Sequence, residues 1–148
     1  MLNKTLLPTL LGLLLVLSGM ASAENSQDFG NYVVHFNALN TNYLPPAITR
    51  EYGLKRSKNR GMINVAVLRK VMGTTGTPVA AEISASATNL TGQKRDIALR
   101  EVREGNAIYY IGDFPISHEE TLRFKLHVKP GDDGEANEVK FTHKFYTQ

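Results

Sequence analysis

The sequence predicts an all-β protein, built as a seven-stranded antiparallel two-sheet sandwich with an immunoglobulin-like topology. Seven short segments alternate apolar and polar residues, and turns rich in glycine, proline or polar residues separate them. No long segment repeats apolar residues at helical spacing. Because each sheet has one apolar face, two sheets must pack together to bury both faces. A small closed β-barrel is the alternative that the same pattern permits.

The first strand is predicted over residues 29–39, where Tyr32, Val34 and Phe36 share one face. Residues 40–53 do not continue this alternation of apolar and polar residues. The pair Pro45 and Pro46 lacks the N–H groups that a sheet needs, and a glycine follows the next few residues. We therefore expect a loop there, with one short helix at most.

The second strand is predicted over residues 62–71, and a glycine- and proline-containing turn over residues 73–78 ends it. Residues 79–90 form the third predicted strand, since apolar side chains occupy every second position from Val79 to Ala87. This period of two is typical of a sheet with one buried and one solvated face.

Four further strands are predicted in the second half of the chain. The fourth covers residues 94–103, and Glu104-Gly105-Asn106 forms a hairpin turn. The other three are expected over residues 107–114, 121–129 and 138–147.

Residues 1–23 have the layout of a secretory signal peptide. Lys4 supplies positive charge, residues 10–17 are apolar, and Ala21-Ser22-Ala23 supplies small residues for cleavage after Ala23. A membrane anchor is the alternative, but the apolar stretch is shorter than the roughly 20 residues that span a bilayer. We expect residues 24–148 to form a single β-sandwich domain in the periplasm, with no membrane span in the mature protein.

Composition excludes several classes of function. The 148 residues include no cysteine, which excludes a disulfide framework, a thiol nucleophile, a thiolate metal site and a lipid-bearing cysteine. The net charge of +3 is too small to indicate a nucleic-acid partner. The expected partner is a protein or a component of the envelope, and the sequence does not identify it.

A basic loop is the most distinctive candidate binding feature. Lys55, Arg56, Lys58 and Arg60 place four cations within six positions, just before a predicted strand. Such a loop suits an anion, since arginine binds carboxylate and phosphate groups in a bidentate manner. The alternative is a solvated loop whose charges keep the end of a sheet soluble.

Tyrosines are the second group of binding candidates, because a tyrosine combines apolar area with a polar tip. The candidates are Tyr32, Tyr43, Tyr52, Tyr109 and Tyr110. Adjacent residues of a strand face opposite sides, so we expect one of Tyr109 and Tyr110 to be exposed, and we select Tyr109. Packing in the core is the alternative.

No catalytic, metal or cofactor site is predicted. The histidines, His35, His118, His127 and His143, lack a local ligand spacing. No serine lies in a Gly-x-Ser-x-Gly elbow, and no glycine-rich phosphate loop precedes a helix. The acidic residues between 132 and 138 indicate a turn, and a calcium site is the alternative interpretation.

Two stretches resemble a known family. Residues 52–61, Tyr-Gly-Leu-Lys-Arg-Ser-Lys-Asn-Arg-Gly, precede Ile63-Asn64-Val65, and Asp113-Phe114-Pro115-Ile116 precedes Thr121-Leu122-Arg123-Phe124. Both are similar to regions of the exported bacterial family called domain of unknown function 4426 (DUF4426). The resemblance implies a periplasmic β-sandwich and carries no catalytic assignment.

These observations together favour a non-enzymatic periplasmic binding or adaptor module for a protein or envelope component. An anion- or glycan-binding protein and a small metal-dependent hydrolase are the alternatives. The hydrolase needs a constellation of side chains that only the three-dimensional structure can reveal.

Overall fold

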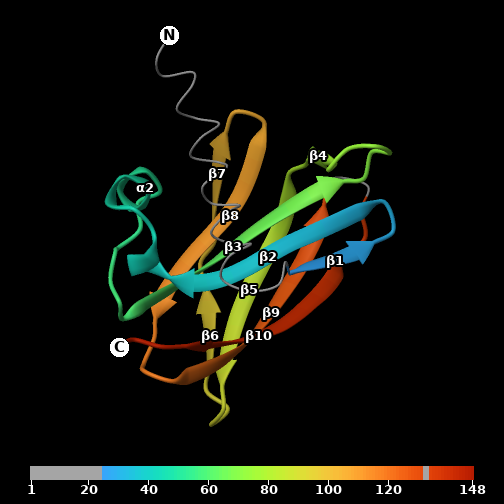
Figure 1. Ribbon diagram of the computed structural model, residues 1–148. Coiled ribbons are helices and arrows are strands. Elements are labelled where there is room, and N and C mark those ends of the chain that lie inside the picture. The colour runs from blue at the N-terminus through green and yellow to red at the C-terminus, as the bar shows by residue number, and fades with distance from the viewer. Residues whose placement is uncertain (1–24, 132–133) are drawn as a thin grey trace.

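The computed structural model describes residues 25–131 and 134–148, and two antiparallel sheets packed face to face form its body (Figure 1). One sheet has the order β1-β2-β3-β8-β7, with the short strand β4 paired to β3. The other has the order β10-β9-β5-β6. The strands are β1 (Ser26–Phe29), β2 (Tyr32–Asn40), β3 (Arg60–Arg69), β4 (Thr77–Pro78), β5 (Ala81–Asn89), β6 (Lys94–Ile97), β7 (Arg100–Glu104), β8 (Ala107–Pro115), β9 (Glu120–Pro130) and β10 (Asn137–Phe145).

This topology confirms the predicted sandwich, and neither sheet closes into a barrel. In an immunoglobulin fold the strands lie in the orders A-B-E-D and G-F-C-C′. Strands β2, β3, β8 and β7 occupy the first set of positions, and β10, β9, β5 and β6 occupy the second. Strand β1 extends the first sheet beyond β2.

Two of the predicted strands divide in the structure. A tight turn at Gly30, with φ of +58°, separates β1 from β2 inside the first predicted strand. The predicted strand over residues 94–103 divides into β6 and β7, which belong to different sheets. The chain crosses between the sheets at Ala98 and Leu99, and it passes so close to Gly112 that a Cβ there would lie 2.6 Å from the carbonyl oxygen of Ala98.

The main core lies between the two sheets. The alternating residues of β3, β5 and β9 that were predicted to be apolar on one face point into it, among them Val65, Ala87 and Leu126. Aromatic rings cross the interface, since Phe36 of β2 and Phe124 of β9 both pack on Phe141 of β10, with ring centroids 4.6 and 4.8 Å apart.

A second, smaller core lies on the outer face of the β1-containing sheet. The segment between β2 and β3 folds over this face through η1 (Thr41–Tyr43) and helix α2 (Pro46–Glu51). Pro46 stands in the first turn of α2, and Gly53 follows it with φ of +66°, as expected for a short helix with a glycine stop. Leu44, Ile48, Tyr52 and Leu54 pack there against residues of β3 and β8.

Both members of the tyrosine pair on β8 are therefore buried, so the prediction that one of them is exposed is wrong. Tyr110 points into the main core and Tyr109 into the second one, with 7% and 4% of their surface exposed. The sequence pattern implies that only one face of this sheet is covered, whereas the segment around α2 covers part of the other.

The predicted signal peptide and its cleavage point after Ala23 lie outside the described residues. Within residues 25–131 and 134–148, no helix is long and apolar enough to cross a membrane.

Candidate functional site

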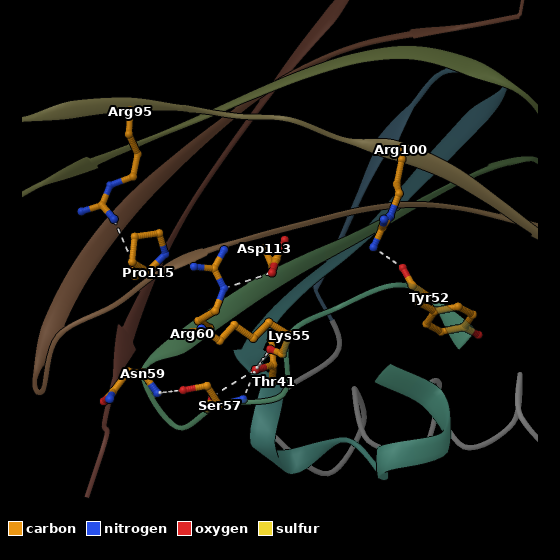
Figure 2. Close-up of polar contacts among 10 residues, drawn as sticks. All are labelled: Thr41, Tyr52, Lys55, Ser57, Asn59, Arg60, Arg95, Arg100, Asp113 and Pro115. Atoms are coloured by element: carbon orange, nitrogen blue, oxygen red, sulfur yellow. Dashed lines mark hydrogen bonds and ion pairs between the residues drawn. The ribbon is translucent and has the colours of Figure 1, made fainter. Parts of the chain in front are cut away.

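The basic loop between α2 and β3 is held in one conformation by the buried Thr41. Its hydroxyl group lies 2.8 Å from the carbonyl oxygen of Lys55 and 3.0 Å from that of Ser57, and it accepts a 2.8 Å hydrogen bond from the Ser57 N–H (Figure 2). The Asn59 N–H donates to the Ser57 hydroxyl oxygen over 3.1 Å. These bonds fix the backbone of the loop, so its side chains project from a rigid base.

Arg56 acts as a clamp on the preceding segment. Its Nε donates to the carbonyl oxygen of Leu44, and its Nη2 donates to that of Asn42, both over 2.9 Å. The two carbonyl groups stand on either side of Tyr43, whose side chain is 60% exposed. The guanidinium group thus holds the backbone that presents an exposed tyrosine.

Arg60 has an acidic partner. Its Nε lies 3.0 Å from Oδ2 of Asp113 on β8, and both side chains are about one quarter exposed, at 27% and 26% (Figure 2). Lys55 and Lys58 are exposed, and neither ammonium group contacts a carboxylate among the residues described here. Of the four predicted cations, two are engaged in the fold and two are available to a ligand.

The C-terminal segment joins the loop at the same end of the sandwich. Asn40 Nδ2 donates to the carbonyl oxygen of Lys58 over 3.3 Å and to that of Tyr146 over 2.7 Å. The side chain of Tyr146 is 50% exposed, and the Lys144 ammonium group lies 5.4 Å from its ring centroid. His118 packs beside the same ring, with centroids 6.1 Å apart.

We call this surface the tyrosine–lysine end, and it consists of Tyr43, Lys55, Lys58, Lys144 and Tyr146. Sequence reasoning identified the loop lysines and included Tyr43 among several tyrosines. It missed Lys144 and Tyr146, because only the long-range bonds of Asn40 bring the C-terminal segment to the loop.

Tyr109, the tyrosine selected from the sequence, lies in the second core and is almost fully buried there. Burial, with a contribution from the nearby Glu104, raises its pKa to about 12. Burial also raises the pKa of Tyr52 and that of Glu104, for the same reason, because it disfavours the negatively charged form of each side chain. Glu104 is 5% exposed, and the neighbouring Tyr52 hydroxyl group opposes the effect of burial on its pKa but does not outweigh it.

The four histidines are spread over different parts of the sandwich. His127 is exposed on β9, 3.8 Å from a carboxyl oxygen of Glu138, while His143 packs on Phe145 with ring centroids 4.6 Å apart. Burial lowers the pKa of His143. His118 accepts a 3.1 Å hydrogen bond from the Thr147 N–H. Among residues 25–131 and 134–148, no three histidine or carboxylate side chains come together as a metal-ligand set.

The predicted calcium alternative concerns the turn between β9 and β10, and Asp132 and Asp133 of that turn lie outside the described residues. The adjacent carboxylates of Glu119 and Glu120 do not share a common site. Glu120 contacts Arg95 over 3.4 Å and accepts from the Ser117 N–H over 3.2 Å, whereas Glu119 is exposed in the turn.

Fold and site together define an immunoglobulin-like β-sandwich protein that carries a rigid, exposed tyrosine- and lysine-bearing surface at one end. The chain belongs to the DUF4426 family, described as a domain of unknown function, whose model matches residues 26–148. This finding agrees with the resemblance seen in the sequence.

Solved structures extend the comparison. A DUF4426 family protein from Pseudomonas aeruginosa PAO1 is 37% identical, with a TM-score of 0.71, and the match covers 83% of this chain and 94% of that one. FetP of uropathogenic Escherichia coli strain F11, recombinantly expressed in the periplasm, is 14% identical with a TM-score of 0.60, over 84% of this chain and 94% of FetP. A copper-bound variant of FetP gives 14% identity and a TM-score of 0.57, over 83% and 90%. The FetP likeness concerns the fold. No curated protein sequence matches this chain.

Proposed function

We propose that this protein is a periplasmic, non-enzymatic binding module that engages a protein partner of the envelope through the tyrosine–lysine end. The observation that carries the proposal is the pair of half-exposed tyrosines, Tyr43 and Tyr146, each held on a backbone that side-chain hydrogen bonds fix in place. A large side chain on a rigid base loses little conformational freedom when it binds.

Residue types at this end suit a protein interface. Tyrosine is enriched among the residues that contribute most to protein–protein affinity, because it buries apolar area and still offers a hydroxyl group. Lys144 lies beside the Tyr146 ring, and the exposed Lys55 and Lys58 add positive charge on the neighbouring loop. Such cations accelerate association with an acidic partner and disfavour basic ones. We therefore expect a partner with an acidic surface around an apolar or aromatic patch.

The signal-peptide pattern of residues 1–23 supports the periplasmic part of the proposal, because such a segment directs export. The expression of the structurally similar FetP in the periplasm is consistent with it. N-terminal sequencing of the protein purified from periplasm tests the cleavage after Ala23, with Glu24 as the expected first residue.

A pull-down from envelope extract tests the binding function. The bait proteins are the parent, the double variant Tyr43→Ser/Tyr146→Ser, and a control, Met72→Ser/Leu90→Ser, whose side chains are 101% and 65% exposed elsewhere on the surface. We expect the parent and the control to retain the same protein and the tyrosine variant to lose it. All three baits must show the same thermal unfolding transition. If the tyrosine variant captures as much partner as the parent, or the parent captures no specific protein, the proposed function is wrong.

A further inference from the structure

The outer face of the four-stranded sheet carries a concentration of cations that adjoins Lys144 of the tyrosine–lysine end, since Lys144 lies two residues after Thr142 on the same face of β10. Strand register places its side chains in two adjacent rows that run across β6, β5, β9 and β10. The first row is Lys94, Thr88, Arg123 and Thr142, and the second is Asp96, Ser86, Lys125 and Lys140. We call these two rows the basic sheet face.

Like charges stand directly opposite each other on this face. Lys125 of β9 pairs in register with Lys140 of β10, an arrangement that destabilises a sheet. Glu138 lies 3.2 Å from the Lys140 ammonium group, and the lysines around it hold the pKa of Glu138 below its usual range. Lys94, Arg123 and Lys125 form no ion pair with any of the described residues. An anion bound between them relieves the repulsion.

The face is hollowed. A depression of about 510 Å³ crosses the four strands, and hydroxyl groups of Ser86, Thr88 and Thr142 line it together with the four cations. A second depression of about 480 Å³ adjoins it and shares Ser86, Lys94 and Lys125 with the first. Both volumes lie in the range of small-molecule sites. The two depressions share these three residues and therefore form one trough across the sheet.

We propose that the basic sheet face binds a linear anionic polysaccharide along this trough. Cations and hydroxyl groups alternate along the first row, and Ser86 stands beside Lys125 in the second, which matches a ligand that carries both acidic groups and hydroxyl groups. The carboxylate of Asp96 stands at the β6 end of the second row. Adjacent strands lie about 4.8 Å apart, so the distance between two cations of one row is set by the number of strands between them. A polymer with charges repeated along its length therefore meets several of them at once.

Other polyanions fit less well. The large apolar side chains that are exposed among the described residues, Tyr43, Val71, Met72, Leu90 and Tyr146, lie outside the face, so it lacks the apolar groups that anchor a protein in a membrane surface. It also lacks the exposed rings on which single-stranded nucleic acids stack, since Phe124 points into the core. Lysine and serine are depleted in the cores of protein interfaces, which argues against a protein on this face.

Binding of defined polymers tests the proposal. The probes are polygalacturonate, which carries carboxylates, heparin, which carries sulfates, neutral dextran, and phosphatidylglycerol vesicles. Each is measured by isothermal titration calorimetry at low and at physiological salt. The variant is Arg123→Ser/Lys125→Ser, and the matched control is Arg50→Ser/Lys70→Ser, which removes the same charge from positions outside the basic sheet face and the tyrosine–lysine end. All four side chains are exposed, so both variants are expected to fold as the parent does.

We expect one or both anionic polymers to bind and dextran not to bind. The sheet variant is expected to lose affinity for the anionic polymer by about tenfold or more. Its affinity should also depend less on salt concentration, because each contact between a cation and an anionic group adds to that dependence. The control is expected to change affinity less than about twofold. Equal losses in both variants indicate attraction by net charge and overturn the proposal. Absence of binding by both anionic polymers also overturns it, as does binding to phosphatidylglycerol vesicles alone. The pull-down with tyrosine variants reports separately on the proposed function.

Discussion

Asn40 donates a 2.7 Å hydrogen bond from Nδ2 to the carbonyl oxygen of Tyr146, and this bond joins the end of β2 to the segment that follows β10. The same amide group contacts the carbonyl oxygen of Lys58 over 3.3 Å. Asn40 is 3% exposed, so its two donors satisfy backbone carbonyl groups in a place with little access to water. One buried side chain therefore connects the two sheets and the basic loop.

Asn40→Ala is expected to lower the free energy of unfolding by about 1–3 kcal/mol, because two carbonyl groups lose their partner in a buried position. Asn59→Ala, at an exposed position of the same loop, is expected to change it by less than about 0.5 kcal/mol. Urea denaturation of the three proteins measures both effects. Equal stability of the parent and Asn40→Ala contradicts the connecting role of this side chain.

Gly112→Ala is expected to destabilise the protein by about 1–3 kcal/mol through overpacking. An added Cβ lies 2.6 Å from the Ala98 carbonyl oxygen and 2.7 Å from Cγ2 of Ile97, where the chain crosses between the sheets. Gly30→Ala adds a carbon that meets nothing and incurs only the strain of φ at +58°, about 1 kcal/mol. Thermal unfolding should rank Gly112→Ala below Gly30→Ala, and the reverse order contradicts the close crossing.

Glu119→Gly is expected to stabilise the protein by up to about 1 kcal/mol. Glu119 has φ of +59° in the turn between β8 and β9, a conformation that costs a residue with a Cβ and costs glycine nothing. Glu119→Ala retains a Cβ and serves as the control, with no gain expected. Chemical denaturation of both variants decides, and a gain in Glu119→Ala as large as in Glu119→Gly removes the conformational explanation.

Glu104→Gln is expected to become more stable than the parent as the pH rises. Burial raises the pKa of Glu104 in the folded state, so the stability that the neutral carboxyl group contributes is fully present below the unfolded pKa of about 4.3 and is lost as the pH rises through the folded pKa. Urea denaturation between pH 4 and pH 8 measures the difference between variant and parent.

Glu101→Gln provides a control of opposite sign. Its bonds from Arg103 and Tyr110 lower the pKa of Glu101, so the parent gains stability above the unfolded pKa and loses it as the pH falls through the folded pKa. A difference between Glu104→Gln and the parent that does not vary with pH contradicts the buried, neutral carboxyl group.

The alternation of apolar residues sufficed to predict the sandwich, because a two-residue period leaves one face of each strand apolar and two such faces must meet. The same reasoning failed at residues 94–103, where Ile97 and Leu99 continue the alternation while the chain passes from one sheet to the other. Local pattern does not report such a crossing, because the apolar side chains point into the same core before and after it.

The loop cations illustrate a second limit. Their clustering was visible in the sequence, but the engagement of Arg56 with the carbonyl groups of Asn42 and Leu44, and of Arg60 with Asp113, depends on contacts across the fold. Tyr109 was misjudged for a related reason, since the cover over its face comes from a segment about 60 residues earlier in the chain. The basic sheet face could not be predicted from the sequence either, because its cations come from three separate strands.

The crossing at Ala98 and Leu99 also affects how the sandwich is expected to unfold under mechanical force. Among the described residues the chain passes between the sheets near residues 79–80, 98–99 and 116–119, whereas β2 and β10 face each other across an edge without a covalent connection. The crossing at residues 98–99 joins the edge strands β6 and β7, and the other two lead to central strands, so no crossing closes the edge formed by β2 and β10. Strand β1 and the C-terminal strand β10 both lie at this open edge (Figure 1). We expect tension between the two ends of the domain to act on that edge and to detach the edge strands first, before the core between the sheets separates.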